Sequence, residues 1–357
     1  PPYMGKSGMN KPLLAHADNS FPNSKADLFA MFMERSMGLV VAGGINALIT
    51  MQSWMFLSSF AELRKRIVGR CELLSMAHLG ERAFDSIGGA VVSTTAYILK
   101  TGRGEAKERE FIRLVDGRSE DEKSRALRLV ARGEDKSFVY RMSSEKLGKL
   151  PGKIIGYWAG DATADAFEQL EPVDKIAVPK QGLATGDNGR FTRSWHEVSH
   201  RDINHSVPSF SDSDQPNIKW VPYSKGGGFR RWYGYAETLV LWTNAGDEIR
   251  NFKDEKGNER SRFRGYDYYF QPAGTWGKIS SGSFACRFRP SGYVYDVGGM
   301  SIFPKACDLK SLVGMLNSKA TDHFLGLLSS TLNYVLDDVA KIPVQGDLLK
   351  SFEVRNK

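Results

Sequence analysis

The sequence predicts an α/β chain of two domains, in which the back half of a doubly wound α/β domain is followed by a β-rich α+β domain. Residues 1–148 alternate between helical and strand-like patterns, whereas glycine, aromatic residues and short β-like runs dominate from residue 149 to about residue 305. The length of 357 residues exceeds one typical domain. A content of 41% hydrophobic and 25% charged residues is ordinary for globular protein.

The first elements of the α/β pattern lie between the N-terminus and residue 68. Residues 4–24 are rich in Lys, Asn, Ser and Pro, which predicts an exposed loop, and Asp27 then caps a helix over residues 27–39. The apolar run at residues 47–51 predicts a short buried strand, and residues 56–68 have the pattern of a second helix.

Two further strands are predicted at residues 73–78 and 90–99, the second of which is rich in β-branched residues. The order helix, strand, helix, strand, strand is typical of the back half of an α/β domain. Because these strands are too few for a complete doubly wound sheet, we expect the front half to lie upstream of Pro1. With no initiator Met at its start, the chain is expected to be a piece of a longer protein.

A strongly charged excursion follows at residues 103–136, where 19 of 34 residues are charged and the signs are mixed. We expect a strand over residues 111–115 and a helix that begins at the capping box Ser119-x-x-Glu122. Residues 138–141 are expected to return to the sheet.

A change of domain is predicted near Leu150-Pro151-Gly152, which places the two domains at residues 1–148 and 149–357. In the second domain, helical spacing returns only over residues 308–336. Its apolar face consists of Leu312, Leu316, Leu325 and Leu328.

The overall charge is basic, since 49 Lys and Arg against 41 Asp and Glu give +8 and a pI near 9.2, which suits a polyanionic partner. Cys71, Cys286 and Cys307 are widely spaced and indicate neither a disulfide framework nor a thiolate zinc site. Residues 36–61 carry no charge, but glycines and polar residues interrupt the run and exclude a membrane span. With no signal-peptide pattern, we expect a cytoplasmic protein.

The chain begins with Pro1-Pro2-Tyr3, followed at once by glycine and lysine residues. Tandem prolines fix φ and remove two amide donors, so that they form a stiff turn with outward-facing carbonyls, and the aromatic ring behind them can stack on an extruded base. A ligand for proline-binding domains is the alternative interpretation of the same tripeptide.

A basic and aromatic segment at residues 219–234 contains four cations, five aromatic residues and no acid. Guanidinium and ammonium groups contact phosphate, while aromatic rings pack or wedge, so this composition indicates DNA contact. An exposed β-hairpin with ordinary snorkelling cations is the alternative. The candidate DNA-binding residues are Lys219, Lys225, Arg230, Arg231, Trp232, Tyr233, Lys278 and Arg287, and Arg289 could extend the surface.

His196-Glu197-Val198-Ser199-His200 matches the pattern His-Glu-x-x-His, in which two imidazoles one helical turn apart bind zinc. The pattern requires a helix, but residues 201–208 are a poor helical continuation and the glycines in 182–189 leave little room upstream. His205 is also misplaced for the extended three-His arrangement. We therefore expect no metal site and keep a zinc hydrolase only as an alternative.

Several of these segments resemble a known family. Pro1-Pro2-Tyr3 resembles the last three residues of the Asn-Pro-Pro-Tyr motif of amino-group DNA methyltransferases. Phe84 resembles the second aromatic residue that gamma-type adenine methyltransferases place against the flipped base, although an isolated Phe is also a common core residue. Other segments are similar to the PglX family, the large adenine-specific methyltransferases of BREX phage-resistance systems: residues 27–32, 49–57, 79–80, 83–89, 182–188, 232–234 and 316–319. The last also resembles recognition regions of type I and type IIG restriction-modification enzymes.

The resemblance implies a Rossmann-like methyltransferase domain followed by a target-recognition domain that grips double-stranded DNA. It implies N6-methylation of adenine from S-adenosylmethionine, with other phage-defence subunits as possible partners. Its catalytic set is Pro1, Pro2, Tyr3 and Phe84, in which the two aromatic rings stack on the base and the Pro1 carbonyl orients the amino group. The main cofactor site is expected upstream, so that the chain as given binds DNA but is inactive. A non-catalytic DNA-binding or specificity module is the other alternative.

Overall fold

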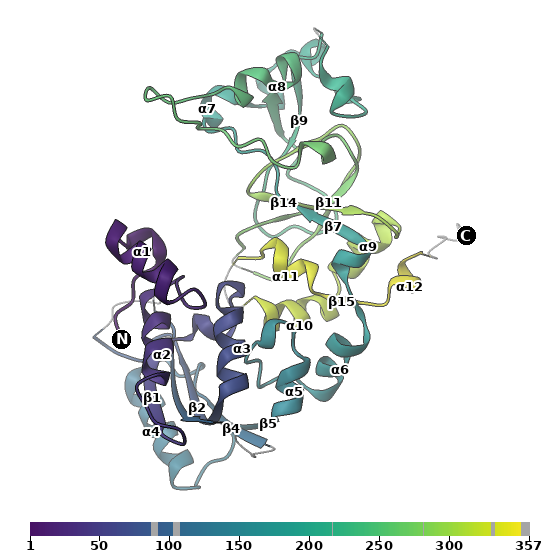
Figure 1. The fold of residues 1–357 in the computed structure, drawn as a ribbon. Coiled ribbons are helices and arrows are strands. Elements are labelled where there is room, and N and C mark those ends of the chain that lie inside the picture. The colour runs from purple at the N-terminus through teal and green to yellow at the C-terminus, as the bar shows by residue number, and fades with distance from the viewer. Residues whose placement is uncertain (87–91, 103–107, 216, 281, 330–332, 351–357) are drawn as a thin grey trace. The chain divides into compact units, whose positions relative to one another are not determined.

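The structure is a computed structural model that describes residues 1–86, 92–102, 108–215, 217–280, 282–329 and 333–350. The chain divides into two compact units, Pro1–Gln169 and Leu170–Lys357 (Figure 1). The division lies between residues 169 and 170, whereas the expected boundary lies between residues 148 and 149. The intervening helices α5 (Ser144–Lys149) and α6 (Asp161–Gln169) pack together in the first unit, where Lys149 forms ion pairs with Asp165 and Glu168.

The first unit is built on a five-stranded sheet with the order β1-β3-β2-β4-β5. Its strands are β1 (Ile45–Met51), β2 (Cys71–Gly80), β3 (Thr94–Thr101), β4 (Glu108–Arg113) and β5 (Val139–Ser143). Strand β3 is antiparallel to both β1 and β2, and β2 is parallel to β4, so that β1, β2 and β4 end at the same edge. The strands expected near residues 47–51, 73–78, 111–115 and 138–141 are present. Of the strand expected at 90–99, residues 90 and 91 lie outside the described residues.

Helices α2 (Leu28–Met37) and α3 (Ala61–Arg70) cover one face of this sheet (Figure 1). Asp27 caps α2 as expected, since its carboxylate accepts a hydrogen bond from the Phe29 amide at 3.3 Å. Helix α3 begins later than residue 56, because residues 52–55 and 58–60 form two short 3-10 turns instead. The buried guanidinium of Arg64 donates hydrogen bonds to carbonyl oxygens in this irregular segment, which satisfies them without a continuous helix.

The exposed loop expected at residues 4–24 is wrong, because this segment contains helix α1 (Lys11–Ser20). The Asn10 side chain accepts a hydrogen bond from the Leu13 amide at 3.0 Å, which caps the helix, and a proline in the first turn favours its start. Ala17 packs with Met9 and Met31 in a small apolar cluster. Tertiary packing therefore stabilises a helix that the polar composition hides.

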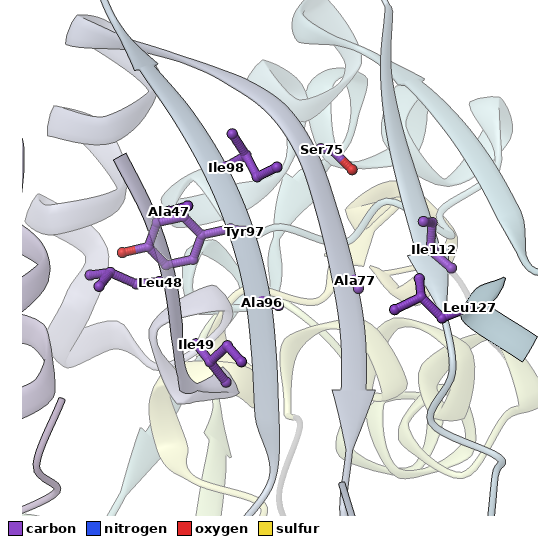
Figure 2. Close-up of a pocket in the computed structure, with 10 residues that line it drawn as sticks. All are labelled: Ala47, Leu48, Ile49, Ser75, Ala77, Ala96, Tyr97, Ile98, Ile112 and Leu127. Atoms are coloured by element: carbon purple, nitrogen blue, oxygen red, sulfur yellow. The ribbon is translucent and has the colours of Figure 1, made fainter. Parts of the chain in front are cut away.

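The opposite face of the sheet presents a row of small and aliphatic side chains. Ile49, Ala96, Ile98, Ala77 and Ile112 lie on this face, with Leu127 of α4 (Glu120–Ala131) at one side (Figure 2). Ile49 and Ile98 are exposed, and the outer edge of β1 pairs with no strand among the residues that the structure describes.

The second unit is rich in short strands, as expected, and combines two four-stranded sheets with a two-stranded ladder. The sheet orders are β13-β9-β10-β8, β12-β11-β14-β7 and β15-β6. The strands are β6 (Glu171–Pro172), β7 (Ala177–Lys180), β8 (Thr192–Ser194), β9 (Trp220–Ser224), β10 (Thr238–Leu241), β11 (Ala273–Gly277), β12 (Arg287–Arg289), β13 (Val294–Tyr295), β14 (Gly299–Pro304) and β15 (Pro343–Val344).

The helices of this unit are short, and most lie near its C-terminus. They are α7 (Asn188–Phe191), α8 (Thr243–Arg250), α9 (Leu309–Leu316), α10 (Lys319–Leu328), α11 (Leu336–Ala340) and α12 (Gly346–Lys350). The predicted apolar face of residues 308–336 is confirmed, since Leu312, Leu316, Leu325 and Leu328 are all buried. An aromatic core around Tyr223, Trp242 and Tyr295 lies beneath the strands. Both units together give the mixed α/β structure that the sequence predicts.

Candidate functional site

The first candidate site is the N-terminal turn, which is tied to the start of helix α2. The Met4 amide donates to the Asp27 carboxylate at 3.0 Å, and the Leu28 amide donates to the Met4 carbonyl oxygen at 3.0 Å. Asp27 therefore holds the turn and caps the helix with one carboxylate. Pro1 and Pro2 are both exposed.

The Tyr3 ring lies at the surface of this turn, with 36% of its area exposed. It packs edge-on against Phe29, with ring centroids 6.0 Å apart, and Phe29 in turn contacts Phe60. Partial burial, followed by the nearby Asp27 charge, raises the pKa of the Tyr3 hydroxyl. The ring is therefore neutral at ordinary pH and supported from one side.

Phe84 lies in the loop that follows β2 and is partly exposed. Helix α4 holds this loop: the Lys123 ammonium donates to the Leu79 carbonyl oxygen at 2.7 Å, and the Asp85 amide donates to the Glu120 carboxylate at 3.0 Å. Among the described residues, Phe84 makes no ring contact with Tyr3. This role of α4 was not predicted, because the buried Lys123 lies in a strongly charged stretch whose composition indicates exposure to solvent.

A buried polar cluster lies beside the edge where β1, β2 and β4 end. The His78 ring is held between the Tyr157 hydroxyl, 3.0 Å from Nδ1, and the Gln52 side-chain oxygen, 2.7 Å from Nε2. Burial, followed by the nearby charges of Arg113 and Lys123, lowers the pKa of His78 to about 3. The imidazole is therefore neutral and fixes the loop after β1 against β2.

The second candidate site is the loop between β9 and β10, which we call the aromatic loop (residues 226–235). Phe229, Trp232 and Tyr233 project from it with 53%, 57% and 65% of their areas exposed. Arg230 is also exposed, and its guanidinium lies 5.2 Å from the Tyr235 ring centroid. Three exposed rings and an exposed cation within five residues are unusual on a protein surface and suit stacking combined with phosphate contact.

The other predicted DNA-binding residues differ in their accessibility. Lys219 is exposed and lies 3.5 Å from Asp202, while Lys225 and Lys278 are partly buried. Arg231 forms an ion pair with Asp322 at 3.0 Å and is only partly exposed, so part of its charge is already neutralised.

The prediction that Arg287 and Arg289 extend the exposed surface is wrong, because both side chains are fully buried. They point inward from β12 because an edge strand with the sequence Arg-Phe-Arg places its first and third side chains on the same face. Their guanidinium groups bind carbonyl oxygens of the aromatic loop, including that of Gly234. They lie beneath the candidate surface rather than on it.

The His-Glu-x-x-His segment does not form the helix that a zinc site requires. Residues 195–197 form one 3-10 turn, Val198 is extended, and His200 begins another turn. The Glu197 carboxylate accepts a hydrogen bond from the Ser194 amide in a capping box. No group of three metal-ligating side chains occurs among the residues described. The zinc-hydrolase alternative therefore lacks its geometric basis.

The structure also bears on the expectations for the cysteines and for a membrane span. Cys71, Cys286 and Cys307 are free thiols, in agreement with the absence of a disulfide framework. No helix within the described ranges is long and apolar enough to cross a membrane.

Comparison with known proteins finds that the N-terminal part of this chain is similar to restriction-modification methylases. A model of the family described as "Eco57I restriction-modification methylase" matches residues 1–84. A solved structure of the type IIL restriction-modification enzyme MmeI in complex with DNA has a TM-score of 0.55, with 11% identity. That match covers 98% of this chain and 45% of the MmeI chain, and it shows a similar fold.

Two curated relatives make the resemblance to the PglX family firm. The chain is 38% identical over 347 residues to "Adenine-specific methyltransferase PglX" of Lacticaseibacillus casei (strain Zhang), which covers 96% of this chain and 29% of that protein. It is also 38% identical over 348 residues to "Adenine-specific methyltransferase BrxX" of Escherichia coli O9:H4 (strain HS), covering 96% and 27%. The predicted resemblance is confirmed across nearly the whole chain, which spans less than a third of either relative.

Proposed function

We propose that this chain acts within an adenine-specific DNA methyltransferase that methylates the N6 amino group from S-adenosylmethionine, in a phage-defence or restriction-modification system. The observation that carries the proposal is the 38% identity over 96% of the chain to two adenine-specific methyltransferases. Double-stranded DNA is the proposed partner, and further defence subunits are possible ones.

The first unit serves as the back half of a Rossmann-like catalytic domain. The aliphatic face of Figure 2 and the unpaired edge of β1 support this role, since an exposed apolar sheet face is stabilised when further elements cover it. The apolar lining of this sheet face does not fit the charged methionine part of S-adenosylmethionine, so no described residue is assigned to the cofactor. When bound, the cofactor supplies the methyl group.

Pro1, Pro2, Tyr3 and Phe84 form the proposed base-binding set. An adenine that leaves the duplex loses its stacking, and aromatic rings can restore about 1–3 kcal/mol per base. Tyr3 is suited to this, because its ring is exposed and supported by Phe29. The carbonyl oxygen of the exposed Pro1 would accept a hydrogen bond from the adenine amino group and so orient its lone pair.

The second unit serves as the target-recognition domain that grips DNA. Of the predicted DNA-binding cations, the exposed Arg230 and the exposed Lys219, which pairs loosely with Asp202 at 3.5 Å, are best suited to phosphate contacts, while Trp232 and Tyr233 are suited to contact bases. The partly buried Lys225 and Lys278 and the paired Arg231 would contribute less. The MmeI structure of similar fold contains bound DNA, which agrees with this role.

The test uses the full-length protein that contains this chain and measures methyl transfer from labelled S-adenosylmethionine to mixed-sequence duplex DNA. Tyr3→Ala should reduce methyl transfer roughly 5- to 150-fold, the rate cost of losing about 1–3 kcal/mol of base stacking. Phe32→Ala removes a different exposed ring in the first unit and should leave transfer unchanged. A wild-type protein that binds duplex but transfers no methyl group would instead support the non-catalytic DNA-binding alternative.

A further inference from the structure

The backbone of the aromatic loop is fixed by its contacts. Its backbone forms a bridge to β12, in which the Trp232 amide donates to the Cys286 carbonyl oxygen at 3.0 Å and the Phe288 amide donates to the Trp232 carbonyl oxygen at 2.9 Å. Trp232 and Tyr235 have positive φ angles of 73° and 53°, which are unfavourable for aromatic residues. Backbone strain of this kind persists only where the surrounding contacts fix it, and it is typical of functional loops.

Glycines allow the loop to fold tightly on itself. A Cβ atom at Gly234 would lie 2.2 Å from the Cδ of Arg230, and one at Gly227 would lie 2.7 Å from the Tyr235 ring. The side chains that pack inside the loop thus occupy the space that other residues would need. The tight packing leaves Trp232 and Tyr233 pointing into solvent from a rigid backbone.

Two buried arginines lie beneath the aromatic loop and act on it in different ways. Arg289 donates strong hydrogen bonds to the carbonyl oxygens of Gly234 and Tyr235, at 2.5 and 2.8 Å. Arg287 reaches the carbonyl oxygens of Gly228 and Arg230 only at 3.5 and 3.4 Å, near the limit for a hydrogen bond. Arg289 therefore holds the loop, whereas Arg287 contributes little to holding it.

Arg287 is a poorly compensated buried charge. Its Nε and Nη2 atoms have no hydrogen-bond partner within the described part of the chain, and neither buried arginine forms an ion pair with a carboxylate there. Its guanidinium lies 5.2 Å from the Tyr235 ring centroid. Burial, followed by the neighbouring charge of Arg289, lowers the pKa of Arg287 to about 10, so that it remains charged at neutral pH. A buried, unpaired cation reduces stability, and such a cost is typical of functional sites.

We infer that the aromatic loop is a wedge whose Trp232 and Tyr233 rings stack on DNA bases, and that the charge of the buried Arg287 attracts the phosphates around the wedge. This inference rests on the proposed DNA-binding function of the second unit. The approaching phosphates would provide the counter-charge that Arg287 lacks inside the protein, because a buried charge is screened less than an exposed one.

The test measures the affinity of the full chain for a fluorescein-labelled mixed-sequence duplex across a series of salt concentrations. Trp232→Ala should weaken binding roughly 5- to 150-fold, the range expected for one base-stacking ring, without changing the salt slope. Arg230→Ala is the matched contrast, because losing a phosphate contact should reduce the slope by about 0.9. A duplex with 2-aminopurine should also brighten with wild type and not with Trp232→Ala, since unstacking increases its fluorescence.

Arg287→Met separates an electrostatic role of Arg287 from a merely structural one. The substitution keeps the volume and removes the charge, so the thermal midpoint should stay or rise while binding at low salt weakens on the order of threefold. A lower midpoint with unchanged affinity would overturn the role of Arg287. Wild-type affinity in Trp232→Ala would overturn the wedge, while a wild-type chain that fails to bind duplex would overturn the DNA-binding function as well.

Discussion

The buried His78 predicts how the stability of the first unit depends on pH. Burial lowers the pKa of His78 to about 3, whereas the ring in the unfolded chain has its ordinary pKa of 6.5. Below pH 6.5 the unfolded state binds a proton that the folded state does not, so stability must fall as the pH decreases. Integrating the difference from about pH 6.5 to about pH 5 gives a loss of about 1.6 kcal/mol. This result holds for any folded-state pKa well below 5.

The assay is urea unfolding of the full chain at both pH values. Pulsed hydrogen exchange, measured on peptides from β2 and β3, reports the unfolding of the first unit. His78→Gln should lower stability at neutral pH but remove most of the additional loss between the two pH values. His16→Gln, which changes an exposed histidine of the same unit, should leave the pH dependence intact. If His78→Gln and wild type lose the same free energy over this pH interval, the imidazole is not buried in its neutral form.

Two further predictions concern the residues that hold the candidate base-binding loops. Lys123→Met removes the ammonium that donates to the carbonyl oxygens of Leu79 and Leu114, at a cost of about 2–4 kcal/mol, and leaves Leu114 only the longer bond from the Gly117 amide. The thermal midpoint of the first unit should fall by about 4–16 °C in calorimetry, and a shift within error would contradict this. Asp27→Ala removes the cap of α2, at about 1 kcal/mol, and removes the hydrogen bond that holds the Met4 amide directly after Tyr3. Methyl transfer by the full-length protein should then decrease, while Asp27→Asn, which keeps an accepting oxygen, should retain most of it.

The strands of the first unit were predictable because a buried strand leaves a short apolar run whose neighbours break the pattern. Residues 47–51 and 73–78 illustrate this, and both lie inside observed strands. The caps at Asp27 and Ser119 were predictable for the same local reason, since the side chain bonds to an amide two or three residues away. Local patterns therefore determine much of this α/β unit.

Buried cations were not predictable, because their burial depends on contacts between segments far apart in the sequence. Lys123 lies in the most charged part of the chain, yet its ammonium reaches a carbonyl 44 residues away. Arg287 and Arg289 reach the aromatic loop over more than 50 residues. Composition alone suggests that such residues are exposed, and only the folded loops supply the carbonyl oxygens that satisfy them.

The choice of carbonyl oxygens as partners has a physical consequence for the second unit. A carboxylate would hold the loop as firmly as a carbonyl does, but it would also cancel the positive charge of the arginine. The carbonyls of Gly234 and Tyr235 satisfy the hydrogen bonds of Arg289 and leave its charge in place. The loop is thereby held by a guanidinium group that still attracts anions. Arg289 can therefore hold the aromatic loop and keep its positive charge, because its partners there are carbonyl oxygens rather than a carboxylate.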